Sequence, residues 1–331
     1  MNRREFIGVL GAIAASSSLT ARAEEEGRLR RVGVLMFYSD SDPLGHARLK
    51  AFEQSLEKLG WTAGRNVNIE VRWSAADPEH TQQFAKELVA WQPDVIVTTS
   101  TPTTAAVKRE TRTTPIVFTV VSDPVGEGFV QSLARPDGNI TGFVNFEPSL
   151  AGKWLSLLKE IDPGILRVAG LFNPDAAPDG GSYFSRAFEA AAREIAITPR
   201  VNPVRSIAEI DSAISAVANE SGAGLVMMAD SFMAVHRGTV IKQAGRHRVP
   251  AVYPFRSAPA DGGLLSYGPD VAELFRQVAP YVDRILRGAQ PSGLPVQAPT
   301  KFELVINLQA AKSLGLDVPT TLLGRADDVI E

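Results

Sequence analysis

Short apolar segments alternate with amphipathic segments along most of the chain. Residues 32–37 predict a buried strand, and in the helix expected after it Leu49, Phe52, Leu56 and Leu59 recur at spacings of three and four. Further strands are predicted at 67–73, 95–98, 116–121 and 140–146. Repeated strand–helix units of this kind indicate a parallel sheet covered by helices.

The same pattern restarts after residue 146. The following strands and helices are predicted: strands at 168–172, 198–204, 224–229, 251–253 and 302–306, and helices at 183–195, 269–287 and 308–314. A Pro- and Gly-rich extended segment is expected at 290–299. The chain therefore predicts two similar α/β lobes in series, with tail segments that cross back between them.

Composition narrows the class of partner. The formal net charge is -3, and no long Lys/Arg run occurs, so nucleic acid and anionic membranes are not expected as partners. A small molecule is the expected ligand. The 331-residue chain has no cysteine, which excludes disulfides, thiolate metal sites and a cysteine nucleophile.

The N-terminus resembles an export signal. Arg3 and Arg4 precede a mildly apolar run that ends in Ala21-Arg22-Ala23, an A-x-A cleavage pattern. The arginine pair is typical of twin-arginine signals, although the general secretory route stays open. We predict that residues 1–23 are removed after Ala23. A periplasmic, soluble product without a lipid anchor is expected, because the run is too short to span a bilayer and no cysteine is available.

The sequence does not match the known motifs for catalysis or for cofactor binding that it partly resembles. The histidines lack zinc-binding spacing and cysteine companions; they are His46, His80, His236 and His247. Gly126-Glu127-Gly128 lacks the third glycine of a dinucleotide loop. Two Ser-x-x-Lys matches, at 55–58 and 156–159, lie on predicted helices. We therefore expect no metal, no cofactor and no catalytic residue.

Residues 95–104 predict a strand that leads directly into a helix N-terminus. Hydroxyl residues follow the strand, and Pro102 suits a first helical turn. Unpaired backbone N–H groups and the helix dipole favour an anion there, and Ser100, Thr101 and Thr103 could add hydroxyl donors to a carboxylate. The alternative is that these hydroxyls only cap their own helix.

Polar and aromatic residues also follow the other predicted strands, where open parallel sheets bind ligands. The candidate ligand-binding residues at these ends are Tyr38, Ser39, Asp123, Asn173, Asp230, Tyr253 and Phe255. Asp123 or Asp230 would suit an ammonium group, and the aromatic rings would supply apolar walls. Together with hydroxyls for a carboxylate, this set suits an amino acid. Helix capping by the aspartates and core packing by the aromatics are the alternatives.

Several ordered stretches support a resemblance to a known family. They are residues 31–35, 59–61, 64–66, 92–96, 115–118, 123–125, 132–136, 138–142, 250–253 and 263–268, among them Gln92-Pro-Asp-Val-Ile96, Gly138-Asn-Ile-Thr-Gly142 and Gly263-Leu-Leu-Ser-Tyr-Gly268. The chain resembles the ABC-transporter substrate-binding proteins that include tryptophan- and tyrosine-binding members. The likeness covers about residues 30–331.

This resemblance implies a type I periplasmic-binding fold: two Rossmann-like lobes hinged around a central ligand cleft. Lobe 1 is expected at 30–146 with a return segment at 269–299, and lobe 2 at 147–268 with the segment 300–331. It also implies a monomer that closes on an amino acid, aromatic as the leading choice, and docks on an ABC permease in the membrane. The alternatives are a ligand-sensing module for a membrane receptor and a two-lobed enzyme.

Overall fold

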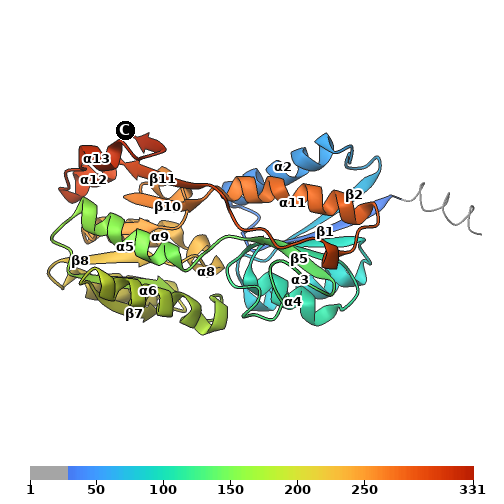
Figure 1. The fold of residues 1–331 in the computed structure, drawn as a ribbon, viewed down its shortest axis with the longest axis horizontal. Coiled ribbons are helices and arrows are strands. Elements are labelled where there is room, and N and C mark those ends of the chain that lie inside the picture. Colours follow the sequence, from blue (N-terminus) through green and yellow to red (C-terminus); the bar gives the residue numbers. More distant parts are fainter. Residues whose placement is uncertain (1–28) are drawn as a thin grey trace, which may run out of the picture.

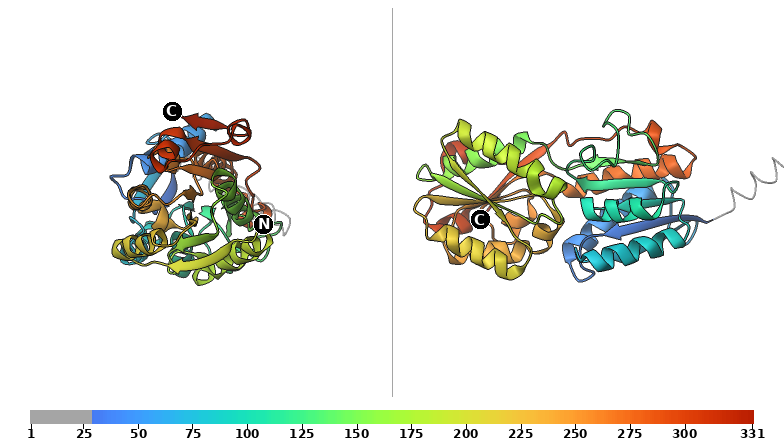
Figure 2. Two further views of the ribbon diagram at one scale, coloured as in Figure 1. Left: turned by 90° about the vertical axis from the view of Figure 1, so that its left-hand side faces the viewer. Right: turned by 90° about the horizontal axis from the view of Figure 1, so that it is seen from below.

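The computed structural model describes residues 29–331 as two α/β units side by side along the long axis (Figure 1). The predicted export signal at 1–23 lies outside the described residues. Each unit has its own sheet, one of five strands and one of seven. Parallel strands dominate both sheets and helices flank them, so the predicted fold class is confirmed (Figure 2).

The first sheet is parallel throughout, with the strand order β2-β1-β3-β4-β5. Its elements are β1 Arg30–Met36, α2 Pro43–Lys58, β2 Val67–Trp73, α3 Pro78–Ala90, β3 Val95–Thr98, α4 Thr101–Glu110, β4 Ile116–Val121 and β5 Ile140–Val144. Asp42 caps α2 and Asp77 caps α3, each followed by proline in the first turn. These caps set the strand-to-helix turns that face the second sheet.

The second sheet has the order β12-β11-β10-β9-β8-β6-β7. Its strands are β6 Arg167–Phe172, β7 Thr198–Pro203, β8 Ala223–Met227, β9 Ala251–Tyr253, β10 Leu265–Pro269, β11 Phe302–Asn307 and β12 Asp328–Ile330. Its helices are α5 Ser149–Ile161, η1 Pro178–Gly181, α6 Ser182–Glu194, α7 Ile207–Ala218, α8 Ser231–Val235, α9 Arg237–Arg246, α10 Ser257–Ala260, α12 Leu308–Leu314 and α13 Thr320–Leu323. The pair β10–β11 is antiparallel, and the other pairs in this sheet are parallel.

The chain passes between the two units three times. It crosses after β5 to reach α5, and again after β10 to reach α11 (Val271–Leu286), which packs against α2 and the first sheet. After η2 (Pro291–Gly293) it returns to the second sheet as β11. We call the unit built on β1–β5 with α11 the first lobe, and the unit built on β6–β12 the second lobe.

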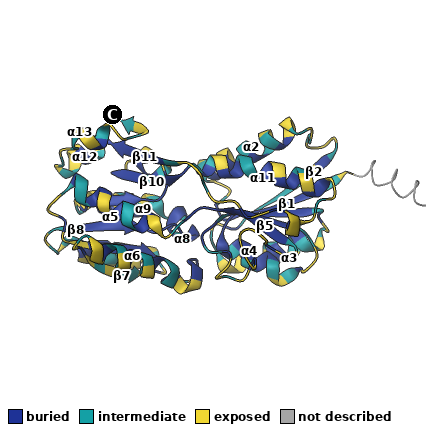
Figure 3. Ribbon diagram, in the orientation of Figure 1, coloured by how far each residue is buried: buried dark blue, intermediate teal, exposed yellow. Residues whose placement is uncertain are grey.

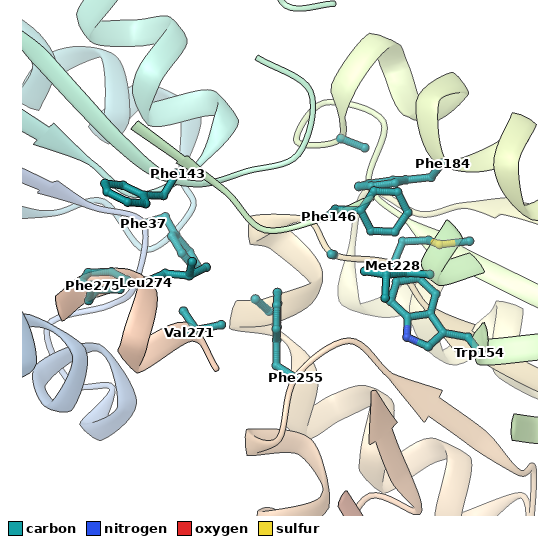
Figure 4. Close-up of a cluster of buried hydrophobic side chains, with 14 of the residues drawn as sticks. Phe37, Phe143, Phe146, Trp154, Phe184, Met228, Phe255, Val271, Leu274 and Phe275 are labelled. Carbon is teal, nitrogen blue, oxygen red and sulfur yellow. The ribbon is translucent and has the colours of Figure 1, made fainter. Parts of the chain in front are cut away.

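The central strands of both sheets are buried, whereas the edge strands β2, β7 and β12 and the outer faces of the helices are partly exposed (Figure 3). The largest apolar cluster contains residues of both lobes, so the lobes contact each other through apolar side chains. Phe37 and Phe143 come from the first lobe, and Phe146, Phe184 and Phe255 lie on the side of the second lobe (Figure 4). Within residues 29–331, no helix combines the length and the apolar character needed to cross a bilayer.

Candidate functional site

A narrow cavity of about 10 Å³, room for about one water molecule, lies between the lobes. Residues of both lobes line it: Phe37, Ser100, Thr101 and Val120 from the first, and Ala176, Pro178, Ala229, Asp230, Ser231, Ala234 and Phe255 from the second. Four of the sequence-predicted residues therefore meet here. Phe37 comes from the first lobe and Phe255 from the second (Figure 4), and both supply aromatic walls to the cavity.

The hydroxyl groups in the turn at residues 98–104 have two roles: some cap helix α4 and some line the cavity. Ser100 caps α4 and forms a capping box with Thr103. The Thr103 hydroxyl accepts hydrogen bonds from the backbone N–H groups of Thr99 (3.0 Å) and Ser100 (2.9 Å), and its side chain is buried away from the cavity. Thr103 thus has the capping role that the sequence left open as an alternative.

Thr101 in the first lobe and Ser231 in the second occupy equivalent positions, and each faces the opposite lobe. Each is the first residue of a helix, α4 in the first lobe and α8 in the second, and each lines the cavity. Neither hydroxyl makes a side-chain hydrogen bond within residues 29–331. Both hydroxyls are therefore available to a ligand held between the lobes.

Asp230 combines a structural role with a place in the cavity wall. One carboxylate oxygen accepts a hydrogen bond from the backbone N–H of Met233 (2.8 Å), and the other from that of Asn173 (2.9 Å). The side chain is buried, and this burial raises the pKa of Asp230 to about 7, against the lowering effect of these hydrogen bonds. Each oxygen keeps a lone pair that could accept a bond from a ligand ammonium group.

Backbone strain marks the cavity wall at Val120. This β-branched residue has φ 57°, in the left-handed region that such residues rarely adopt. It lies where the β4–β5 register shifts between Phe118 and Val121. A Cβ at Gly142 would lie 2.1 Å from the Phe118 oxygen, so only glycine fits opposite this bulge. The bulge turns the backbone at Val120 beside the cavity, a feature typical of binding sites.

A wider cleft adjoins the cavity and holds about 1230 Å³ of space, part of it open to solvent. Thr101 and Ser231 line both spaces. Asn173 lines the cleft, where its side-chain amide donates to the Val204 oxygen (3.0 Å) and its own amide oxygen accepts from the backbone N–H of Asp175 (2.9 Å). Asn173 therefore shapes the entrance rather than the inner cavity.

Four other sequence-predicted residues do not line the inner cavity. The Ser39 hydroxyl bonds to Ser41 in an exposed turn, and Asp123 accepts a hydrogen bond from the backbone N–H of Gly126 (2.8 Å). Tyr253 lies in a separate apolar core of the second lobe, where burial raises the pKa of its hydroxyl. Tyr38 lines a neighbouring inter-lobe cavity, which also touches Phe255.

Polar contacts join the lobes around the cavity. Arg237 of α9 forms an ion pair with Asp42 at the start of α2 (3.0 Å), and both side chains are largely buried. Arg237 also pairs with Asp261 of its own lobe (2.8 Å). Across the cleft, the backbone N–H of Asp179 donates to the Glu127 carboxylate (2.9 Å). The described structure thus has the lobes in contact over the cavity.

Sequence reasoning missed several wall residues. Val120 carries no sequence signal, because its unusual φ depends on the β4–β5 register shift. Ala176 and Pro178 belong to a turn that reads as a loop rich in breakers. Ser231 directly follows Asp230, so its position at a strand end was a usable signal. Among residues 29–331, no group of three or more acidic or histidine side chains could hold a metal ion.

The family model "ABC transporter substrate binding protein" matches residues 31–330, nearly the whole described chain. The chain belongs to this family. Members of this family bind small-molecule ligands, work with an ABC transporter and are extracytoplasmic. The predicted resemblance is thereby confirmed.

Individual relatives agree with this assignment. A tyrosine-binding protein of Clostridioides difficile (strain R20291) is 25% identical over 267 residues, which cover 81% of this chain and 76% of the relative. An ABC domain from Streptococcus pneumonia, solved in complex with L-Trp, has TM-score 0.84 and 25% identity, covering 92% and 100% of the two chains. A conserved domain protein from Vibrio cholerae has TM-score 0.85 and 29% identity, covering 91% and 100%. The fold is that of type I periplasmic solute-binding proteins, and the matched family consists of solute-binding proteins.

Proposed function

We propose that this protein is the solute-binding component of an ABC importer and that it captures an amino acid, preferably an aromatic one, by closure of its two lobes. The observation that carries this proposal is the inter-lobe cavity together with the wider cleft that adjoins it, where two aromatic walls, two hydroxyls and a buried carboxylate come together from both lobes. The named ligands of the tyrosine-binding relative and of the L-Trp complex support the same class of solute.

Each group of an amino acid has a matching partner in the cavity. The N-terminus of α4, with the free hydroxyl of Thr101, suits the carboxylate. Ser231 reaches the same space from the other lobe, and Asp230 suits the ammonium group. Phe37 and Phe255 would stack on or enclose the side chain.

We expect lobe closure because the proposed ligand partners come from both lobes. The first lobe supplies the carboxylate partners, and the second supplies Asp230 and Phe255, so a bound solute bridges both. Only the closed form offers all contacts at once, and the solute therefore shifts the equilibrium toward closure. We further propose that residues 30–146 with 269–299, and residues 147–268 with 300–331, move as the two lobes.

The cellular context of the proposal is export to the periplasm, through a twin-arginine-type signal at 1–23, and delivery of the solute to a membrane permease by the monomeric protein. The closed form would then present a permease with a surface that spans both lobes.

Isothermal titration calorimetry on refolded, ligand-free protein tests this function. We expect L-tryptophan, L-tyrosine or L-phenylalanine to bind and to raise the melting temperature through linkage. Tryptamine lacks the carboxylate and indole-3-propionate lacks the ammonium group, so each should bind at least about tenfold more weakly than L-tryptophan if one buried charge-assisted contact is lost. An affinity for both analogues equal to that for L-tryptophan, or no binding by any amino acid, would refute the proposal.

A further inference from the structure

A buried arginine without a partner lies beside the inter-lobe space. Arg48 of α2 is only 5% exposed, yet its guanidinium forms no hydrogen bond or ion pair with any residue between 29 and 331. Its Cζ lies 4.9 Å from the centroid of the Tyr38 ring, a cation–π contact. Burial and the nearby Arg237 lower the pKa of Arg48 to about 9, against the raising effect of the Asp270 charge. Buried charges in proteins are normally paired, so this one calls for a partner.

The neighbouring carboxylates are already engaged. Asp42 accepts a hydrogen bond from the backbone N–H of Leu44 and pairs with Arg237. Asp270 accepts a hydrogen bond from the backbone N–H of Ala272 (2.8 Å) and pairs with Arg276 (3.3 Å). Neither aspartate therefore neutralises Arg48 through a direct contact.

A second unpartnered donor lines the same space. The Tyr38 hydroxyl is buried and has no hydrogen-bond partner among the described residues. Tyr38 and Arg48 line a narrow inter-lobe cavity of about 10 Å³, room for about one water molecule. Ser257 of the second lobe also lines it, with a hydroxyl that makes no side-chain hydrogen bond within residues 29–331. Arg48 and Ser257 also line an adjoining, more open cavity of about 640 Å³ next to the β10–α11 crossing.

The polar side chains that line this cavity are mainly hydrogen-bond donors. An arginine supplies up to five donors and no acceptor, and the two hydroxyls add donors, so the missing partner is an acceptor with negative charge. A planar carboxylate matches the guanidinium fork in two hydrogen bonds. Phe255 lines this cavity and the proposed amino-acid cavity, so it separates the two sites while touching both.

We propose that Arg48, Tyr38 and Ser257 form an inter-lobe anion site that binds a carboxylate group. Because Arg48 and Tyr38 belong to the first lobe and Ser257 to the second, a bound carboxylate bridges the lobes. The carboxylate belongs either to a solute that extends past Phe255 or to a small free carboxylate ion. The link to closure rests on the proposed function, whereas the anion chemistry does not.

Thermal unfolding with sodium acetate, compared with sodium chloride at equal ionic strength, tests the free-ion source. In the refolded wild-type protein we expect a higher melting temperature in acetate than in chloride. Arg48→Met should abolish this difference, and Tyr38→Phe, which removes only the hydroxyl, should reduce it. The control is Arg325→Met, which removes the same charge from a half-exposed arginine paired with Glu160 and should leave the difference unchanged.

Calorimetry with 4-carboxy-L-phenylalanine and L-phenylalanine tests the solute source. If the second carboxylate reaches the site, Arg48→Met should weaken binding of the carboxylated compound about tenfold or more and should not weaken binding of L-phenylalanine. An acetate effect alone assigns the site to a free ion, and a preference for the carboxylated compound alone assigns it to the solute. If neither occurs, if chloride acts as acetate does, or if Arg48→Met behaves as wild type, the site is refuted. An acetate effect in a protein that binds no amino acid would instead overturn only the proposed function.

Discussion

The ion pair between Asp42 and Arg237 should control how readily the lobes close. Asp42→Asn is the cleanest perturbation, because asparagine still caps a helix well and so keeps the hydrogen bond from the backbone N–H of Leu44. Arg237 keeps its pair with Asp261 and its hydrogen bond to the Ala234 oxygen. The substitution therefore removes the charge of the inter-lobe contact and little else.

The burial of the pair sets the size of the effect. The side chains of Arg237 and Asp42 are 17% and 14% exposed, so their interaction lies between that of a surface pair, up to about 1 kcal/mol, and that of a buried charge-assisted contact, about 3 kcal/mol. A loss of about 1.4 kcal/mol from the closed form raises the apparent Kd about tenfold when the ligand-free protein is mainly open.

Two measurements test this reasoning. Calorimetry with L-tryptophan gives the Kd, and small-angle X-ray scattering of the ligand-free protein reports the lobe separation without requiring a ligand. Asp261→Asn is the matched control, because Asp261 pairs with the same arginine but within one lobe. We expect Asp42→Asn to raise the Kd if the ligand-free wild type is mainly open, or to raise the radius of gyration if it is mainly closed, and Asp261→Asn to change neither. Equal effects of the two variants on both quantities would refute a role in closure.

Two further predictions concern the proposed amino-acid site. Burial raises the pKa of Asp230 from 3.8 to about 7, so the folded state holds its proton more tightly than the unfolded state, and the contribution of Asp230 to the unfolding free energy grows as the pH falls from about 7 toward about 4. Calorimetric unfolding between pH 8 and 5 should show this gain in ligand-free wild type and a flatter profile in Asp230→Asn; parallel profiles would contradict it. Thr101→Val should weaken L-tryptophan binding up to about tenfold with little loss of stability, whereas Thr103→Val should cost about 1 to 2 kcal/mol of stability through the capping box. If calorimetry instead showed weaker binding only for Thr103→Val, and urea unfolding showed lost stability only for Thr101→Val, Thr101 would have a structural role and not a binding role.

The fold could be predicted because local pattern and global topology agree. The spacing of Leu49, Phe52 and Leu56 matches the buried face of α2, and the strands at 95–98 and 251–253 lie where the apolar runs placed them. The strand β12 was missed, because three residues at Asp328–Ile330 carry no clear alternation. The antiparallel pairing of β11 depends on the crossing from the first lobe, a tertiary feature that no local pattern encodes.

The location and the chemical character of the candidate site could be predicted from the sequence, but only some of its residues could. Strand ends identified Ser100, Thr101 and Asp230, because the carboxyl ends of parallel strands gather at one edge. Tyr253 also follows this rule, yet it turns into the core of its own lobe, since side-chain direction in so short a strand is set by packing. Arg48 did leave a signal: it lies four residues from both Leu44 and Phe52, on the face of α2 that is otherwise apolar.

The inter-lobe polar groups fall into two classes with opposite effects on closure. Asp230, Ser100 and Asp42 have partners among residues 29–331, so they are held in place before a solute arrives and lose little entropy when it binds. Arg48 and the Tyr38 hydroxyl have no hydrogen-bond partner among residues 29–331, and under the proposed function their desolvation penalises closure until an acceptor enters. A solute that supplies only the amino-acid contacts leaves that penalty in place. One that also supplies a carboxylate removes it, so a solute with a second carboxylate should favour closure more strongly than one without.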